Sequence, residues 1–131
     1  MTPIHLISPV DGSVYAERTP LTPDAALAAV ARARAAQPAW AAMPLADRVA
    51  RVRAGIAKLA DHKPAIIDEF AWQMGRPTRY GGEFGGVNDR TAYMSDIAAT
   101  TLAPTIVEHS DRFERRIARE PVGVEIGRAH V

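Results

Sequence analysis

The chain has 131 residues, which is the size of one domain and too short for a complete two-domain enzyme. Apolar residues make up 47% and charged residues 24%, as in ordinary globular proteins, and a formal net charge of +1 does not indicate nucleic-acid binding. The absence of cysteine excludes disulfides, thiolate zinc sites and a cysteine nucleophile within these residues.

Membrane insertion and export are not expected either. No apolar stretch reaches the roughly 18 residues that a membrane span needs. The first residues, Met1 to Ser8, lack the basic start and apolar core of a signal peptide. We therefore expect a cytoplasmic protein without membrane or nucleic-acid partners.

The first predicted element is a β-hairpin. Two short runs of strand-forming residues, Ile4 to Ser8 and Ser13 to Glu17, flank an Asp11-Gly12 pair. Asp-Gly between such runs is typical of a tight hairpin turn.

A first helix is predicted to start at Thr22-Pro23-Asp24. Thr22 can accept hydrogen bonds from the free N–H groups of the first turn, Pro23 needs no donor there, and Asp24 suits the positive helix end. The alanine-rich run that follows is expected to end at Pro38, where continuation is costly.

Two further helices follow from apolar spacing. The helix opening near Pro44 has the clearest amphipathic pattern in the sequence, carried by Leu45, Val49, Val52, Ile56 and Leu59. The next is expected to begin at Pro64 and to end at Gly75, which favours the left-handed C-terminal position. Its predicted buried side consists of Ile66, Ile67, Phe70, Ala71 and Met74.

A glycine-rich turn, from Tyr80 to Gly86, precedes a fourth predicted helix that ends before Pro104. The apolar pattern of this helix consists of Val87, Met94, Ile97, Ala98 and Thr101. From Arg112 to Arg119 the period changes to the alternation of an exposed strand. We expect the edge of this strand to have no partner within the chain and therefore to contact another subunit. The predicted contact residues are Phe113, Arg115, Ile117 and Arg119.

None of the candidate chemical motifs predicts a catalytic, cofactor-binding or metal site. Glycines 81, 82, 85 and 86 lack phosphate-loop spacing, and His5, His62, His109 and His130 lack ligand spacing on a shared helix face. The neighbours His109, Ser110 and Asp111 are interpreted as a polar turn, and the consecutive Asp68 and Glu69 as diverging helix charges. The arginines near Phe113 could bind RNA, but Glu114 and Glu120 interrupt them, which favours a subunit contact.

Five segments in collinear order, over about residues 6 to 124, resemble the amino-terminal quarter of the aldehyde dehydrogenase superfamily. They are Ser8-Pro9-Val10-Asp11-Gly12-Ser13-Val14, Ala33-Arg34-Ala35-Ala36-Gln37-Pro38-Ala39-Trp40, Pro44-Leu45-Ala46-Asp47-Arg48, Met74-Gly75-Arg76-Pro77 and Arg119-Glu120-Pro121-Val122-Gly123-Val124. Each motif is weak alone, and their shared order carries the resemblance. For Trp40 and Arg48 we expect scaffold roles, with Trp40 filling a helix junction and Arg48 pairing with or capping nearby carbonyls.

The resemblance implies an α/β fold with a Rossmann-like cofactor domain, of which this chain would be a mainly α-helical part with a small N-terminal hairpin and a C-terminal strand. Residues 1–103 would form the hairpin and the helical layer of the incomplete cofactor-binding domain. Residues 104–121 would start the oligomerisation hairpin, and residues 122–124 would enter the first strand of the sheet.

The resemblance also implies a homo-oligomeric enzyme that oxidises a small-molecule aldehyde to a carboxylic acid with NAD or NADP. In this family a cysteine thiolate attacks the carbonyl, hydride passes to the nicotinamide, and a glutamate-activated water hydrolyses the thioester. The family's Pro-Trp-Asn segment, phosphate loop, glutamate and cysteine have no counterparts in these residues. We therefore expect the chain alone to be inactive and to bind no cofactor productively.

The final seven residues, Glu125 to Val131, depart from the family pattern. They look like the in-frame translation of a common sequencing-adapter oligonucleotide, and we expect them to be foreign to the protein.

Two other functions stay open from the sequence. One is a small helical interaction or regulatory module without catalysis, and the other, weaker, is a basic nucleic-acid binder.

Overall fold

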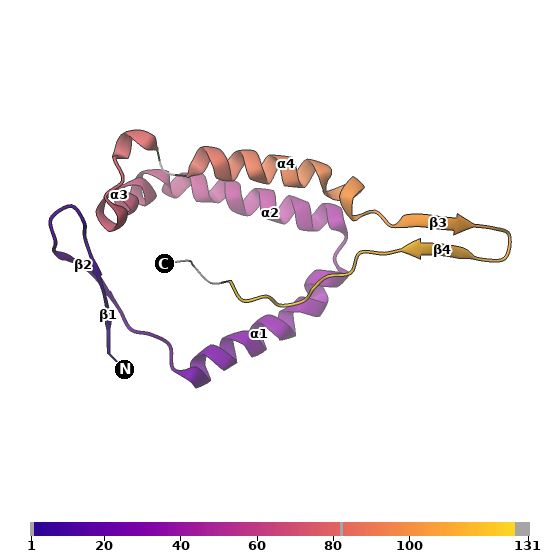
Figure 1. Ribbon diagram of the computed structural model, residues 1–131, viewed down its shortest axis with the longest axis horizontal. Helices are drawn as coiled ribbons and strands as arrows, with labels where there is room; N and C mark the ends of the chain where they lie inside the picture. Colours follow the sequence, from indigo (N-terminus) through magenta and orange to yellow (C-terminus); the bar gives the residue numbers. More distant parts are fainter. Residues whose placement is uncertain (1, 82, 128–131) are drawn as a thin grey trace.

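The computed structural model describes residues 2–81 and 83–127. The elements follow one another as β1 (Ile4–Ile7), β2 (Val14–Arg18), α1 (Pro23–Ala42), α2 (Leu45–Leu59), a short 3-10 turn (Ala60–His62), α3 (Lys63–Met74), a second 3-10 turn (Thr78–Tyr80), α4 (Phe84–Leu102), β3 (Thr105–His109) and β4 (Glu114–Ile117). The strands form two separate antiparallel pairs, β1 with β2 and β3 with β4. Figure 1 shows an open frame, with α2 and α4 side by side, α1 on the opposite side and the β3–β4 hairpin projecting outward.

The predicted N-terminal hairpin is confirmed. Gly12 has φ +76°, the left-handed conformation that this turn requires and that glycine adopts without strain. The backbone closes the turn with a hydrogen bond of 2.8 Å from the Ser8 N–H to the Ser13 carbonyl. The Asp11 side chain accepts from both the backbone N–H and the hydroxyl of Ser13, at 2.9 and 2.7 Å.

These hydrogen bonds give the turn a specific pH dependence. The backbone N–H of Ser13, followed by its hydroxyl, stabilises the Asp11 carboxylate and holds the pKa of Asp11 below its ordinary value of 3.8. A lowered pKa in the folded turn means that this stabilisation is present above the unfolded pKa and is lost as pH falls through the folded pKa. We expect the Ser13 amide proton resonance to titrate with a midpoint below 3.8, as measured by NMR.

The variant Asp11→Asn is the matched control for this titration. It keeps an acceptor oxygen at the same place but has no proton to gain, so the Ser13 resonance should no longer shift over this pH range. A wild-type midpoint at or above 3.8 would contradict the assigned hydrogen bonds.

The hairpin docks on the C-terminal end of α3 through Ser8, a residue that was predicted only as part of a strand. The Ser8 side chain is fully buried, and its hydroxyl donates to the Trp72 carbonyl at 2.7 Å while accepting from the Val10 N–H at 3.2 Å. Tyr15 stacks on Trp72 with ring centroids 6.1 Å apart. Beside them, a Cβ on Gly75 would lie 3.2 Å from the Pro9 ring, so a side chain there would crowd the contact.

Helix α1 begins as predicted but ends later. Thr22 caps it by accepting from the Ala25 N–H at 3.1 Å. The expected end at Pro38 is wrong, because the helix continues through Pro38 to Ala42. Proline removes one helical hydrogen bond, while alanines on both sides favour the helix and the extra turn brings Trp40 beside α2 and α4.

The predicted helix from Pro44 to Leu59 is confirmed as α2, with Pro44 at its N-cap. An ion pair of 2.5 Å between Arg53 and Asp96 connects α2 to α4. The predicted end of α3 is also confirmed, since Gly75 has φ +66° and its N–H donates to the Ala71 carbonyl.

Two details of the next helices differ from expectation. Met74 is 64% exposed rather than buried, because no described element covers the last turn of α3 on that side. Helix α4 begins at Phe84 and so takes in Gly85 and Gly86, which were expected in a turn. Phe84 explains this earlier start, since it is buried among side chains of α2, α3 and α4 that include Leu59 and Phe70.

Strand β3 was not predicted, and its presence corrects the expectation that the C-terminal strand has no partner in the chain. Thr105 lies opposite Ile117 and His109 opposite Glu114, with an irregularity between Ile106 and Glu108. Beyond β4, residues 118–127 form neither helix nor strand, and residues 125–127 are exposed. The rest of the expected foreign segment, residues 128–131, lies outside the described residues.

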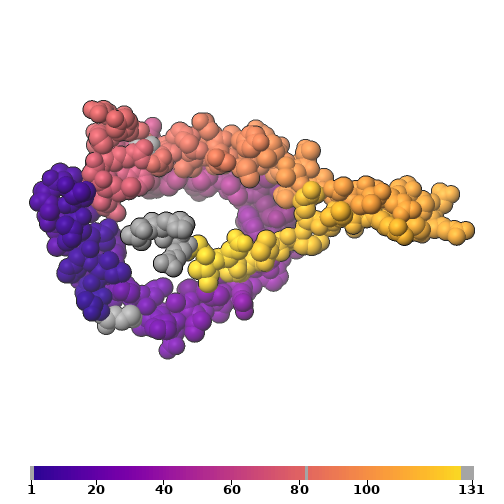
Figure 2. Space-filling view, viewed as in Figure 1, coloured from indigo at the N-terminus to yellow at the C-terminus, as the bar shows by residue number. Residues whose placement is uncertain are grey.

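The chain buries little of its own surface. Its accessible surface is 10,656 Å², whereas a compact monomer of 14.1 kDa exposes about 6,700 Å². Among the described residues, only Phe84 and Ser8 are classed as buried. Figure 2 shows the hollow that the N-terminal hairpin and the helices surround. The helices therefore leave large apolar side chains exposed, among them Leu27, Val52 and Met94.

Candidate functional site

The site residues that the sequence predicted lie on the β3–β4 hairpin or at its base. Every residue of its two strands is exposed, and the hairpin extends away from the helices (Figures 1 and 2). Each strand pairs with the other along one edge, so within the described chain the opposite edge of each strand has no partner. Such edges are the places where strands of other chains can add.

The structure places the four predicted contact residues along the hairpin, although only two lie within β4. Phe113 precedes the strand, and the Arg115 guanidinium lies 4.9 Å from the centre of its ring. Ile117 is the last residue of the strand and is 60% exposed. Arg119 lies beyond it at the hairpin base, where Nη1 donates to the Ala103 carbonyl at 2.7 Å.

Side-chain pairs connect the two strands. Arg115 pairs with Glu108 at 2.9 Å, and His109 lies 3.6 Å from Glu114. These groups are exposed, so each pair contributes little to folding stability. The hairpin therefore offers exposed apolar side chains, Ile117 among them, beside the ion pair of Arg115 with Glu108.

The turn of the hairpin is the polar turn predicted at His109-Ser110-Asp111. The Ser110 hydroxyl lies 3.3 Å from the Phe113 N–H, from which it accepts, and its own N–H donates to the Phe113 carbonyl at 3.0 Å. These bonds explain Ser110 as a turn residue.

The remaining titratable candidates are dispersed. Within residues 2–81 and 83–127, no group of three His, Cys, Asp or Glu side chains could hold a metal ion. His5 lies 3.2 Å from Glu17 on the N-terminal hairpin, and Glu69 accepts from Gln73 one turn along α3. His130 lies outside the described residues.

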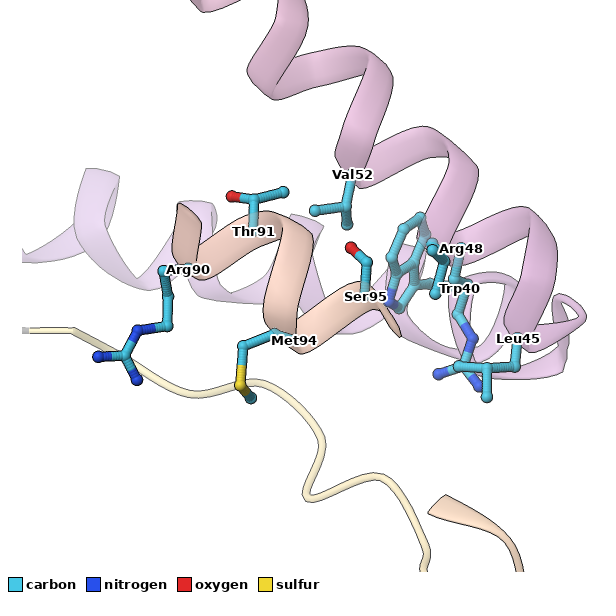
Figure 3. A pocket seen from close by; sticks show the side chains of 9 residues that line it. Trp40, Leu45, Arg48, Val52, Arg90, Thr91, Met94 and Ser95 are labelled. Atoms are coloured by element: carbon cyan, nitrogen blue, oxygen red, sulfur yellow. The ribbon is translucent and has the colours of Figure 1, made fainter. Parts of the chain in front are cut away.

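A second surface feature lies between the end of α1 and the pair α2 and α4. It is a hollow of about 340 Å³, shown in Figure 3. Its lining consists of Trp40, Leu45, Arg48, Val49, Val52, Arg90, Thr91, Met94 and Ser95. Trp40 lies at this junction but is 42% exposed, so it lines the hollow rather than plugging it. Within the described residues, the Nε atom of Arg48 is shielded from solvent and has no acceptor, so it does not cap a carbonyl there. The amphipathic pattern of α2 pointed to this face without identifying it as a hollow.

No helix in the described part of the chain is both long enough and apolar enough to cross a membrane.

Comparisons with known proteins place the chain in one family. Residues 1–127 match the sequence model of the aldehyde dehydrogenase family. This match ends three residues beyond residue 124, where the resemblance was expected to stop. No curated protein matches the sequence.

Solved structures share the fold. A NAD-dependent benzaldehyde dehydrogenase from Corynebacterium glutamicum is 24% identical, with a TM-score of 0.76 over 89% of this chain and 25% of the other. A putative aldehyde dehydrogenase from Burkholderia cenocepacia is 24% identical with a TM-score of 0.79, and PnpE in complex with nicotinamide adenine dinucleotide is 20% identical with the same TM-score. Each of these two alignments covers 92% of this chain and 25% of the other protein. It thus spans about a quarter of the length of these structures, and the match along residues 1–127 shows that the chain belongs to the aldehyde dehydrogenase family.

Proposed function

We propose that the chain is the N-terminal part of an NAD(P)-dependent aldehyde dehydrogenase that oxidises an aldehyde to a carboxylic acid. The observation that carries this proposal is the family match over residues 1–127 in a chain that spans a quarter of its structural neighbours. One of these neighbours is NAD-dependent and another was solved in complex with NAD, so NAD is the first cofactor to test and NADP the second. The partner would be a small-molecule aldehyde, and the location would be the cytoplasm, as expected from the sequence.

In this proposal the chain has a scaffold role. It contains no cysteine that could supply the thiolate, and its inner face is open. The helices α2, α3 and α4 would cover the cofactor-binding sheet, and the β3–β4 hairpin would reach another subunit. The open face also weighs against the rival hypothesis of a self-contained interaction module, since such a module would have to bury its own apolar side chains.

The test is the coding sequence that follows codon 124 in the source genome. We expect it to continue into a Pro-Trp-Asn segment and later to encode a cysteine and a glutamate in family context. The longer protein should then reduce NAD or NADP in the presence of an aldehyde. The same seven final codons before a stop in an independently sequenced genome would contradict the proposal and favour the interaction module.

We further propose that the β3–β4 hairpin mediates homo-oligomerisation of the longer protein. In support, its apolar side chains are exposed, while Arg115 and Glu108 pair with each other within the hairpin. In the longer protein, Ile117→Glu should weaken subunit association at least about tenfold, because an unpaired carboxylate would be buried in the contact. Sedimentation analysis across a range of concentrations measures this change.

Leu27→Glu provides the matched control, since it makes the same chemical change at an exposed apolar residue of α1, away from the hairpin. Its association should equal that of the wild type. Equal association of Ile117→Glu and wild type would place the subunit contact elsewhere.

A further inference from the structure

The two faces of the β3–β4 hairpin differ in composition. Residues that lie directly opposite each other in an antiparallel pair project to the same face, and neighbours along a strand alternate. Arg115 lies opposite Glu108, and Ile117, two residues further along β4, lies opposite Thr105. The Phe113 ring lies against the Arg115 guanidinium and so belongs to the same side. We name this side the Ile117 face; it consists of Thr105, Glu108, Phe113, Arg115 and Ile117.

The opposite side of the hairpin is more polar. Ile106 lies opposite Arg116, and His109 opposite Glu114. The carboxylate oxygens of Glu114 lie 3.6 Å from His109 Nδ1 and 3.8 Å from Arg116 Nη1, so two basic side chains share one carboxylate. This side, which we name the Glu114 face, thus has one apolar side chain among three polar ones.

The charges of the Ile117 face are arranged so that the face can lose water at low cost. Arg115 Nη1 lies 2.9 Å from a Glu108 oxygen, which is hydrogen-bond distance, and the guanidinium also lies 4.9 Å from the centre of the Phe113 ring. A carboxylate and an aromatic ring together replace much of the hydration that a buried arginine gives up. On the Glu114 face, the 3.8 Å between Arg116 and Glu114 is too long for a hydrogen bond, so burial there would cost more.

A second copy of the protein fits the Ile117 face better than the rest of its own chain does. The hairpin extends away from the helices, and every residue of its strands is exposed in the described chain (Figure 1). Homo-oligomers most often use two-fold contacts, in which the same surface patch occurs on both subunits. A patch whose cation and anion cancel each other can meet its own copy without net repulsion.

We infer that the Ile117 face, with its Arg115–Glu108 ion pair intact, is the side of the hairpin that contacts a second copy of the longer protein, while the Glu114 face stays in water. This inference rests on the proposed role of the hairpin in oligomerisation. It adds the face that is used and a positioning residue, Glu108 of β3, which holds Arg115 neutralised within the contact.

The first test compares two Glu→Gln variants of the longer protein by sedimentation across a range of concentrations. Glu108→Gln should weaken subunit association about tenfold or more, because it leaves the Arg115 charge in the contact without its counter-charge. Glu114→Gln is the matched control, since the two glutamate side chains are 45% and 40% exposed and lie on opposite faces of one hairpin. Its association should stay within about twofold of the wild type.

A double variant separates the ion pair from a general effect on folding. Adding Arg115→Gln to Glu108→Gln removes the uncompensated charge, so the double variant should associate more tightly than Glu108→Gln alone. Association that is no tighter in the double variant would overturn the role of Glu108.

The second test uses two isoleucines of similar exposure on opposite faces, Ile117 at 60% and Ile106 at 51%. Ile117→Glu should weaken association at least about tenfold, and Ile106→Glu should stay within about twofold of the wild type. Equal weakening by both would overturn the choice of face and leave the hairpin contact standing. Unchanged association in both would overturn the hairpin contact as well, whereas aldehyde-dependent reduction of NAD or NADP, measured on the same samples, tests the catalytic proposal separately.

Discussion

The isolated chain is expected to unfold without a sharp thermal transition. Its surface exceeds that of a compact monomer by about 4,000 Å². Leaving even several hundred Å² of apolar surface in water costs on the order of 10 kcal/mol at about 25 cal/mol per Å², which equals the stability of a typical domain. Calorimetry should therefore give a broad, weak transition, and far-ultraviolet circular dichroism should still show helix.

Dye binding and size measurements complete this test. A dye that binds exposed apolar surface should fluoresce with the isolated chain, and the chain should elute as an expanded or associated species. A cooperative transition at a monomeric elution volume would show instead that the four helices and two hairpins suffice for a stable fold.

The isolated chain is also expected to produce no NADH or NADPH from any aldehyde. The family's chemistry begins with a thiolate attack, and the chain contains no cysteine. Among the described candidates, Ser110 maintains a turn, and His5 and His109 lie on different hairpins, so these residues do not form a nucleophile and base pair. Absorbance of the reduced nicotinamide, followed with purified chain, simple aldehydes and either cofactor, measures the rate.

The benzaldehyde dehydrogenase from Corynebacterium glutamicum, with benzaldehyde and NAD, serves as the positive control for that assay. A rate from the isolated chain above the buffer rate, lost on further purification, would indicate a contaminant. A rate that persists through purification would contradict the scaffold role.

Local rules predicted the helices and the first hairpin well. The apolar spacing of α2 and the left-handed Gly75 depend on residues close in sequence, and both were confirmed. The errors arose where a distant residue decides the outcome. Pro38 should stop a helix, yet α1 continues and brings Trp40 beside α2 and α4.

The same distinction explains what was missed. Strand β3 was overlooked because its own sequence is short, and it is recognised as a strand through its pairing with β4. Burial of Ser8 depends on the Trp72 carbonyl, which lies 64 residues away along the chain. Equally, no residue pattern could show that Arg48 Nε lacks an acceptor, because that fact depends on the packing of α1, α2 and α4 around it.

The contact between Ser8 and Trp72 closes the frame into a ring, and closure has an entropic cost. Bringing together two points separated by 64 residues costs roughly 4 kcal/mol in chain entropy. One hydrogen bond, the Tyr15–Trp72 stack and the packing of Pro9 beside Gly75 must offset it. A net hydrogen bond contributes about 1 kcal/mol and an aromatic pair about the same, so these two contacts offset only about half of that cost. We therefore expect the ring to open at the N-terminal hairpin, so that limited proteolysis cuts within residues 2–22 before it cuts the helices.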